Sequence, residues 1–197
     1  MFQPRQTGDV FANHDIGKTV LYEYVNALER LFIIDDIDAW CPSIRSKSSI
    51  RASKKRNLVD PSIAVAALGL SPDYFNTDFK TLGFLFESLC VRDLKAYSSA
   101  YDGKVSYYHD RYGLESDCVL HLNDDRYALI EFKLGESEIE NGAKHLLEIE
   151  RLVAEQNKRE AQCPLRLPDV KMVITGTRYG YRRDDNVLVV PIGCLCA

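Results

Sequence analysis

The sequence predicts an α/β protein whose mixed sheet is flanked by helices, and three observations support this fold class. Two alternating runs, Glu115 to Leu122 and Tyr127 to Lys133, are separated by a polar turn and predict an antiparallel hairpin. Apolar residues at helical spacing fill 78–98 before this hairpin and 139–153 after it. The apolar run Val170 to Thr175 follows the second helix, and such a helical crossover predicts a strand parallel to its neighbour.

Length and composition limit the class of protein. With 197 residues, 46% hydrophobic and 27% charged, the chain has the make-up of a globular protein with one substantial core. Its net charge of −4 argues against a general nucleic-acid coat, so any contact with nucleic acid must be local. The cysteines lack C-x-x-C spacing, and the longest apolar run is far shorter than the ~18 residues of a membrane span. We therefore expect a cytoplasmic protein with reduced thiols and no membrane partner.

The N-terminal part is expected to form a helix followed by a short strand. Gly17-Lys18-Thr19 resembles the end of a P-loop, but Ala12 stands where that motif requires glycine, so we expect no nucleotide site in this chain. A strand from Phe32 to Ile37 is predicted after the helix. The helix is predicted from apolar residues at spacings of four and three, namely Val20, Tyr24, Leu28 and Leu31.

A basic segment follows, from Ser43 to Asn57. Basic residues in an acidic protein are candidates for phosphate contacts, and the alternative is a solvated linker. A short helix, Ile63 to Leu68, is predicted next, with Asp60 or Ser62 as its N-cap. The candidates for nucleic-acid contact in the basic segment are Lys54, Lys55 and Arg56.

The helix over 78–98 carries one acid on its apolar stripe, Glu87. A carboxylate in such a position needs a partner. One interpretation places Glu87 at a functional site, and the other pairs it with Arg92 or Lys80 at the edge of the core.

The hairpin predicts a cluster of charges on one face. If the turn is centred on Asp124, Asp117 lies opposite Glu131, and on the same face Glu115 lies opposite Lys133. Two carboxylates this close favour a cation between them, and Mg²⁺ commonly takes one or two carboxylates. A lysine beside them can orient water or offset charge on a phosphate. The other interpretation is a solvated hairpin face in which Glu115 pairs with Lys133. The opposite face is apolar and is predicted to enter the core, with Cys118, Leu120, Ala128, Ile130 and Phe132.

This pattern resembles a known signature. Asp117 followed by Glu131-Phe132-Lys133 at the end of an apolar strand is similar to the D…(D/E)XK motif of the PD-(D/E)XK nuclease superfamily. The wider context, YHDRYGLESD and then ALIEFKLG, resembles the uncharacterised C-terminal domains that follow AAA+ ATPase modules in many prokaryotic proteins. The resemblance implies a restriction-endonuclease-like core over 61–197. It also implies a winged-helix-like remnant and basic linker over 1–60.

The resemblance also implies an activity and a partner. Asp117 and Glu131 would hold Mg²⁺, Lys133 would position the attacking water and Glu87 would assist, in phosphodiester hydrolysis on DNA. An ATPase module absent from this chain would act with it in cis or in trans. The alternative is a non-catalytic module of the same fold that binds nucleic acid or protein. Further candidates for nucleic-acid contact lie on the second helix and in the loop after the strand at 170–175: Lys144, Arg178 and Arg182.

Overall fold

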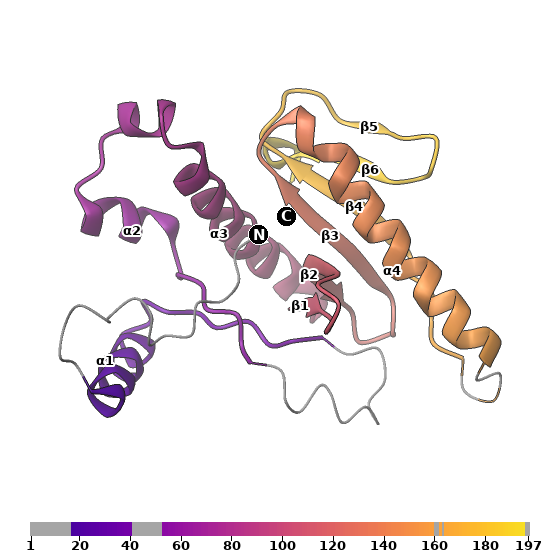
Figure 1. The fold of residues 1–197 in the computed structure, drawn as a ribbon, viewed down its shortest axis with the longest axis horizontal. Coiled ribbons are helices and arrows are strands. Elements are labelled where there is room, and N and C mark those ends of the chain that lie inside the picture. The colour runs from indigo at the N-terminus through magenta and orange to yellow at the C-terminus, as the bar shows by residue number, and fades with distance from the viewer. Residues whose placement is uncertain (1–16, 41–52, 160–161, 163, 196–197) are drawn as a thin grey trace.

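The computed structural model describes residues 17–40, 53–159, 162 and 164–195, and these form a mixed sheet with a long helix on each face (Figure 1). The strand order is β1-β2-β3-β4-β6-β5. The predicted α/β fold class is therefore confirmed. Residues 1–16 of the expected remnant and 43–52 of the basic segment lie outside the described residues.

The sheet joins an antiparallel meander to a parallel part. The meander consists of β1 (Lys104–His109), β2 (Glu115–His121) and β3 (Tyr127–Lys133). β4 (Val170–Thr175) pairs parallel with β3, and β6 (Leu188–Pro191) pairs parallel with β4. β5 (Tyr181–Arg182) is a short antiparallel edge strand in a segment that was expected to be only a loop.

The hairpin has the predicted register, since Cys118 pairs with Ile130 and Leu120 with Ala128. The pairing of β1 with β2 shifts by one residue: Ser106 lies opposite Val119, whereas Tyr108 lies opposite Ser116. Two residues of β2, Asp117 and Cys118, therefore face one residue of β1, which is a β-bulge. The bulge bends β2 at the acid that the sequence singled out.

The two long helices cover opposite faces of the sheet. α3 (Phe79–Ser98) starts at Asp78, whose carboxylate accepts a hydrogen bond of 3.0 Å from the Thr81 N–H, and its buried stripe faces the apolar side of the hairpin. α4 (Ile139–Arg159) packs on the other side, and its core includes Val119 and Leu129. The charged face predicted from the sequence is thus covered by α4. None of the helices in the described ranges combines the length and apolar character needed to cross a bilayer.

The short elements before α3 also follow local signals. α2 (Pro61–Leu68) is capped by Asp60, which accepts a hydrogen bond of 2.8 Å from the Ser62 N–H. It ends at Gly69, whose φ of 63° suits glycine. Within the described residues, 3₁₀ turns span Pro72–Asn76, Ser99–Tyr101, Glu136–Glu138 and Ile192–Cys194.

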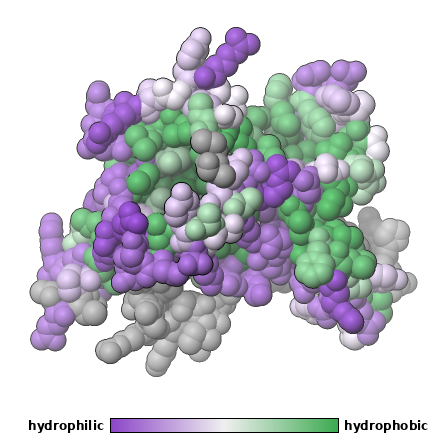
Figure 2. All heavy atoms as spheres, turned by 180° about the vertical axis from the view of Figure 1, so that it is seen from behind, coloured by the Kyte–Doolittle hydropathy of each residue, from purple (hydrophilic) through white to green (hydrophobic). Residues whose placement is uncertain are grey.

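The predicted N-terminal helix is present as α1 (Lys18–Arg30), but its expected apolar stripe is not a core face. Val20, Tyr24 and Leu31 are exposed, and the buried residue of the helix is Leu21. α1 lies away from the sheet in Figure 1, which explains why its spacing does not lead to burial. The face seen in Figure 2 carries green, apolar areas between hydrophilic ones.

The predicted strand from Phe32 to Ile37 does not form as a regular strand. Phe32 has a φ of 56°, which interrupts extended backbone at its start. Ile34 and Ile37 instead make isolated antiparallel bridges with Leu58 and Lys55. We call residues 33–40 and 54–58 together the N-terminal ribbon. It joins the edge of the sheet through a parallel bridge from Ala39 to Tyr107.

Candidate functional site

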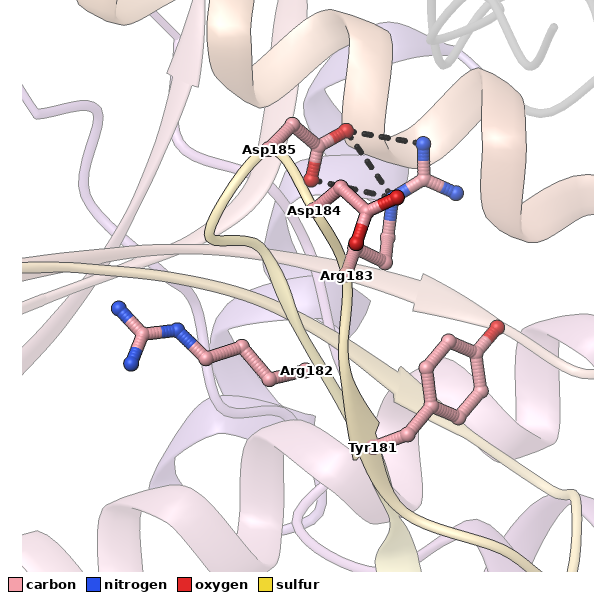
Figure 3. A pocket seen from close by; sticks show the side chains of 5 residues that line it. All are labelled: Tyr181, Arg182, Arg183, Asp184 and Asp185. Atoms are coloured by element: carbon pink, nitrogen blue, oxygen red, sulfur yellow. Dashed lines mark hydrogen bonds and ion pairs between the residues drawn. The ribbon is translucent and has the colours of Figure 1, made fainter.

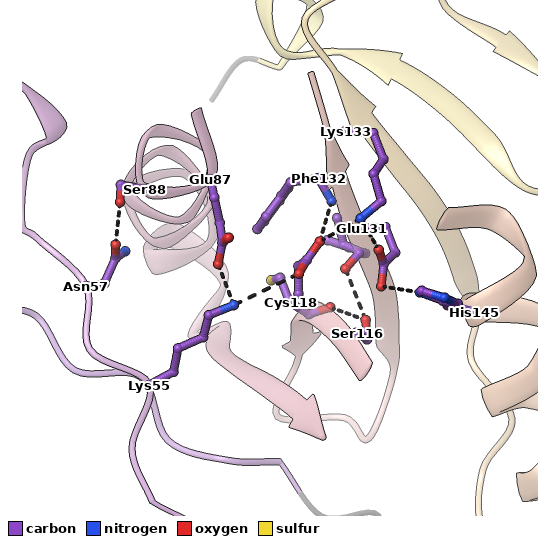
Figure 4. Close-up of polar contacts among 12 residues, drawn as sticks. Lys55, Asn57, Glu87, Ser88, Ser116, Cys118, Glu131, Phe132, Lys133 and His145 are labelled. Carbon is purple, nitrogen blue, oxygen red and sulfur yellow. Dashed lines mark hydrogen bonds and ion pairs between the residues drawn. The ribbon is translucent and has the colours of Figure 1, made fainter. Parts of the chain in front are cut away.

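The predicted acids and lysine meet next to the Cys118–Ile130 pair of β2 and β3. Glu131 and Lys133 can be followed in Figure 4. Lys133 Nζ lies 3.5 Å from Asp117 Oδ2 and 2.6 Å from Glu131 Oε2. The two carboxylate oxygens can be no farther apart than these two distances combined, which is below the ~8 Å beyond which one ion could not join the two groups. The alternative interpretation paired Lys133 with Glu115, but Lys133 contacts Asp117 and Glu131 instead.

Asp117 lies between the strands because of the bulge. Its Oδ2 accepts a hydrogen bond of 2.9 Å from the Phe132 N–H of β3. Its Oδ1 lies 4.0 Å from Lys55 Nζ. The carboxylate thus has one oxygen toward Lys133 and the other toward Lys55.

Glu131 is the most enclosed of the acids. Its side chain is 1% exposed, and each of its oxygens faces a basic group: Lys133 Nζ lies 2.6 Å from Oε2, and His145 Nδ1 lies 3.6 Å from Oε1. Burial raises the pKa of Glu131, and the nearby charge of Asp117 raises it further. Lys133 offsets part of this effect through its ion pair. A buried carboxylate needs a cationic partner, and a metal ion can serve as that partner as well as an ammonium group can.

Glu87 is joined to Asp117 through Lys55. We call Glu87, Asp117 and Glu131 the acid cluster. The Lys55 ammonium group contacts Glu87 and lies near Asp117, while Arg92 binds Asp60 and Asp93 instead. Burial raises the pKa of Glu87, although Lys55 opposes the rise. Burial lowers the pKa of Lys55, but Glu87 and Asp117 more than compensate, so its net pKa is raised.

α4 contributes two residues that the sequence did not single out for the site. His145 Nδ1 lies 3.6 Å from Glu131 Oε1, and this contact raises the pKa of His145. Gly142 lies over β3, where an added Cβ would be 3.2 Å from Lys133 Cε and 3.3 Å from Glu131 Cβ. An isolated glycine inside a helical pattern is the one local signal for such a close approach.

The other basic candidates lie outside the acid cluster and mostly bind other acids. Lys54 lies 3.9 Å from Asp38, and Lys144 lies 3.5 Å from Glu140. Arg56 binds Asp36 at 3.4 Å. Of the three candidates in the basic segment, Lys54, Lys55 and Arg56, only Lys55 contacts the predicted catalytic acids.

The loop after β4 leaves the sheet beside the site, because Thr175 is in register with Lys133. Its Arg178 and Arg182 are exposed. A shallow hollow follows at 181–185, where Arg183 is held by Asp185 at 2.9 Å while Arg182 extends away (Figure 3). Arg178 is thus exposed near the site, whereas Arg182 is exposed farther away, on the outer strand β5.

The donor set fits a hard divalent cation bound by few protein ligands. No group of three or more metal-ligating side chains is present among residues that the structure describes. Two carboxylates suffice for Mg²⁺, which usually keeps several water molecules or takes substrate phosphate oxygens. Asp117 and Glu131 are the pair that meets this requirement.

Two protein families match the chain. Residues 82–195 match the model of a family described as a domain of unknown function, DUF4143, and residues 4–74 match that of a second one, DUF8612. No curated protein and no solved structure matches the sequence. The first match contains all six strands together with Glu87, Asp117, Glu131 and Lys133, whereas Lys55 falls within the second.

Proposed function

Since this chain belongs to the DUF4143 family, whose description assigns no activity, we propose from the site itself that it is a Mg²⁺-dependent phosphodiesterase of the PD-(D/E)XK type. The observation that carries the proposal is the buried Glu131 carboxylate, which lies together with Asp117 around one ammonium group, Lys133 Nζ, at 2.6 and 3.5 Å. Burying a carboxylate beside a second one costs stability, and carboxylates with such perturbed pKa values often belong to functional sites. Holding a cation is the task that fits both acids.

Each residue of the site would have a separate role, set by its position. Asp117 and Glu131 would hold the cation, which would supply a Lewis acid for a phosphoryl oxygen. The pKa of Lys133 is lowered by burial but raised more strongly by Asp117 and Glu131, so this residue is an ammonium ion at neutral pH. As a hydrogen-bond donor it would orient the attacking water, and as a positive charge it would offset the charge that develops on the phosphate. Glu87 would assist from α3 through Lys55.

DNA is the substrate that the sequence resemblance favours. The exposed Arg178 follows Thr175, which is in register with Lys133, and would contact a backbone phosphate near the site. The exposed Arg182 lies on β5, the outer strand of the sheet, and would contact a phosphate farther along the same DNA. The surrounding protein is acidic, so this contact would be confined to the region around the site. An AAA+ ATPase module acting in cis or in trans would bring the substrate to the site.

A second candidate is a non-catalytic module of the same fold. It is favoured by one observation: Lys133 already contacts both acids, and Lys55 contacts Glu87. Such ion pairs neutralise most of the cluster without a metal ion. This module would bind nucleic acid or a partner protein independently of divalent cations.

A cleavage assay tests the proposal. Labelled single-stranded and duplex DNA would be incubated with the protein in Mg²⁺ or Mn²⁺, and again with EDTA. We expect cleavage that requires the cation and falls at least 100-fold in Asp117→Asn and in Glu131→Gln, roughly the loss of a major catalytic group. Glu148→Gln, on the exposed face of α4, is the control and should cleave like the wild type. Metal-independent DNA binding without any cleavage would instead support the non-catalytic module.

A further inference from the structure

The N-terminal ribbon places Lys55 against the acid cluster, whereas its neighbours Lys54 and Arg56 contact other acids. Lys55 and Ile37 exchange two backbone hydrogen bonds, of 2.8 and 2.9 Å, so the position of Lys55 is fixed. Two residues along the same face, Asn57 accepts a hydrogen bond of 2.6 Å from Ser88 Oγ, next to Glu87. These contacts hold the ribbon against α3 at the turn that carries the acid (Figure 4).

Lys55 stands between two carboxylates in the way that a metal ion would. Its ammonium group contacts Glu87 and lies 4.0 Å from Asp117 Oδ1, the oxygen turned away from Lys133. Asp117 therefore borders two positions that a cation can occupy. One lies toward Glu131 and the other toward Glu87.

The charges of the cluster support the same arrangement. Three carboxylates, Glu87, Asp117 and Glu131, face two ammonium groups, Lys55 and Lys133. The cluster therefore retains a net negative charge that one divalent cation would reverse, leaving a site attractive to a phosphodiester. Without Lys55, Glu87 and Asp117 would form a second pair of carboxylates able to bind a cation.

We propose that Lys55 fills the second cation position of the site, so that its ammonium group replaces a second metal ion between Glu87 and Asp117. This inference rests on the proposed function, because it presumes that Asp117 and Glu131 bind the first ion. The lysine side chain is 35% exposed, so its position remains accessible to solvent and to a bound ligand. Lys55 is thus a part of the site and not only a residue of a basic segment.

Counting bound Mn²⁺ ions tests the inference. Electron paramagnetic resonance of free Mn²⁺ would give the number bound by the wild type, by Lys55→Met and by Lys54→Met. Lys54 is the matched control, since it neighbours Lys55 but lies near Asp38 with its side chain 63% exposed. We expect one ion in the wild type, two in Lys55→Met and one in Lys54→Met.

Thermal unfolding provides a readout that needs no activity. Lys55→Met should melt at a lower temperature than the wild type in EDTA, because Glu87 and Asp117 lose the ammonium group that lies between them. Saturating Mn²⁺ should raise its Tm by more than it raises the Tm of the wild type.

The outcomes separate this inference from the proposed function. One ion in both the wild type and Lys55→Met, or two in the wild type, would overturn the role of Lys55 and leave the function standing. No ion in either protein would overturn both. An ion in Lys55→Met alone would support the placement of Lys55 and contradict a metal-dependent function of the wild type.

Discussion

Glu131 has its raised pKa because β3 and α4 enclose it, and this has a consequence for stability. A carboxyl group with a higher pKa in the folded chain holds its proton more tightly there than in the unfolded chain. Its contribution to stability is complete below the unfolded pKa of about 4.3 and is lost as the pH rises through the folded pKa. At neutral pH Glu131 therefore lowers the stability of the fold relative to acid pH.

Glu131→Gln should increase the free energy of unfolding at pH 7, because the amide keeps the shape of the side chain without its charge. The gain should shrink as the pH is lowered and vanish below about pH 4, where Glu131 is protonated in both states. Urea denaturation at several pH values measures it. A loss of stability at pH 7 would mean that Lys133 and His145 stabilise the charge more than burial opposes it.

The individual residues of the site were predictable to different degrees. Asp117, Glu131 and Lys133 lie in adjacent strands, so local alternation was enough to place them together. Glu87 was predicted from its position on an apolar stripe, although its partner was not. Lys55 could not be assigned, because its contact with Glu87 depends on a ribbon that pairs segments distant in the sequence.

At the scale of elements, α4 approaches β3 closely enough that a Cβ added at Gly142 would be crowded, at 3.2–3.3 Å from its nearest neighbours. The atoms that a Cβ would meet belong to Lys133 and Glu131, and the Glu131 Cβ is fixed to the strand. Gly83 of α3 offers a comparison, since an added Cβ there has nothing within 4 Å. A side chain at position 142 would thus meet steric crowding that a side chain at position 83 would not.

Gly83→Ala should stabilise the protein by up to about 1 kcal/mol, the difference in helix propensity between the two residues. Gly142→Ala gains the same propensity, but crowding costs about 1–3 kcal/mol, so it should be at least about 1 kcal/mol less stable than Gly83→Ala. Chemical denaturation of both variants measures the difference. Equal stabilisation would show that α4 can move off β3 without cost.

At the scale of the whole molecule, the N-terminal ribbon belongs to the core of the sheet domain. Ile37 is 2% exposed and packs in the same cluster as α3 and β3, although it lies outside residues 82–195. The sequence predicted the order of helices and strands in that region because each has a local period. The docking of the ribbon was not predictable, because it depends on isolated bridges rather than on a regular strand.

Ile37→Ala should lower the free energy of unfolding by about 2–5 kcal/mol, since it leaves a cavity in a packed core. Leu31→Ala is the control from the same segment of chain; Leu31 is 67% exposed, so its loss should change stability by less than about 0.5 kcal/mol. Thermal or urea unfolding followed by circular dichroism compares them. A small effect for both would mean that the ribbon does not contribute to the fold.

The most direct test of a metal-dependent site is calorimetric titration of Mg²⁺ at neutral pH into the wild type and into the double variant Asp117→Asn with Glu131→Gln. The account predicts binding by the wild type and none by the double variant, with both proteins folded by circular dichroism. Equal binding by the two proteins would place the ion elsewhere. A wild type that binds no Mg²⁺ would contradict the central claim.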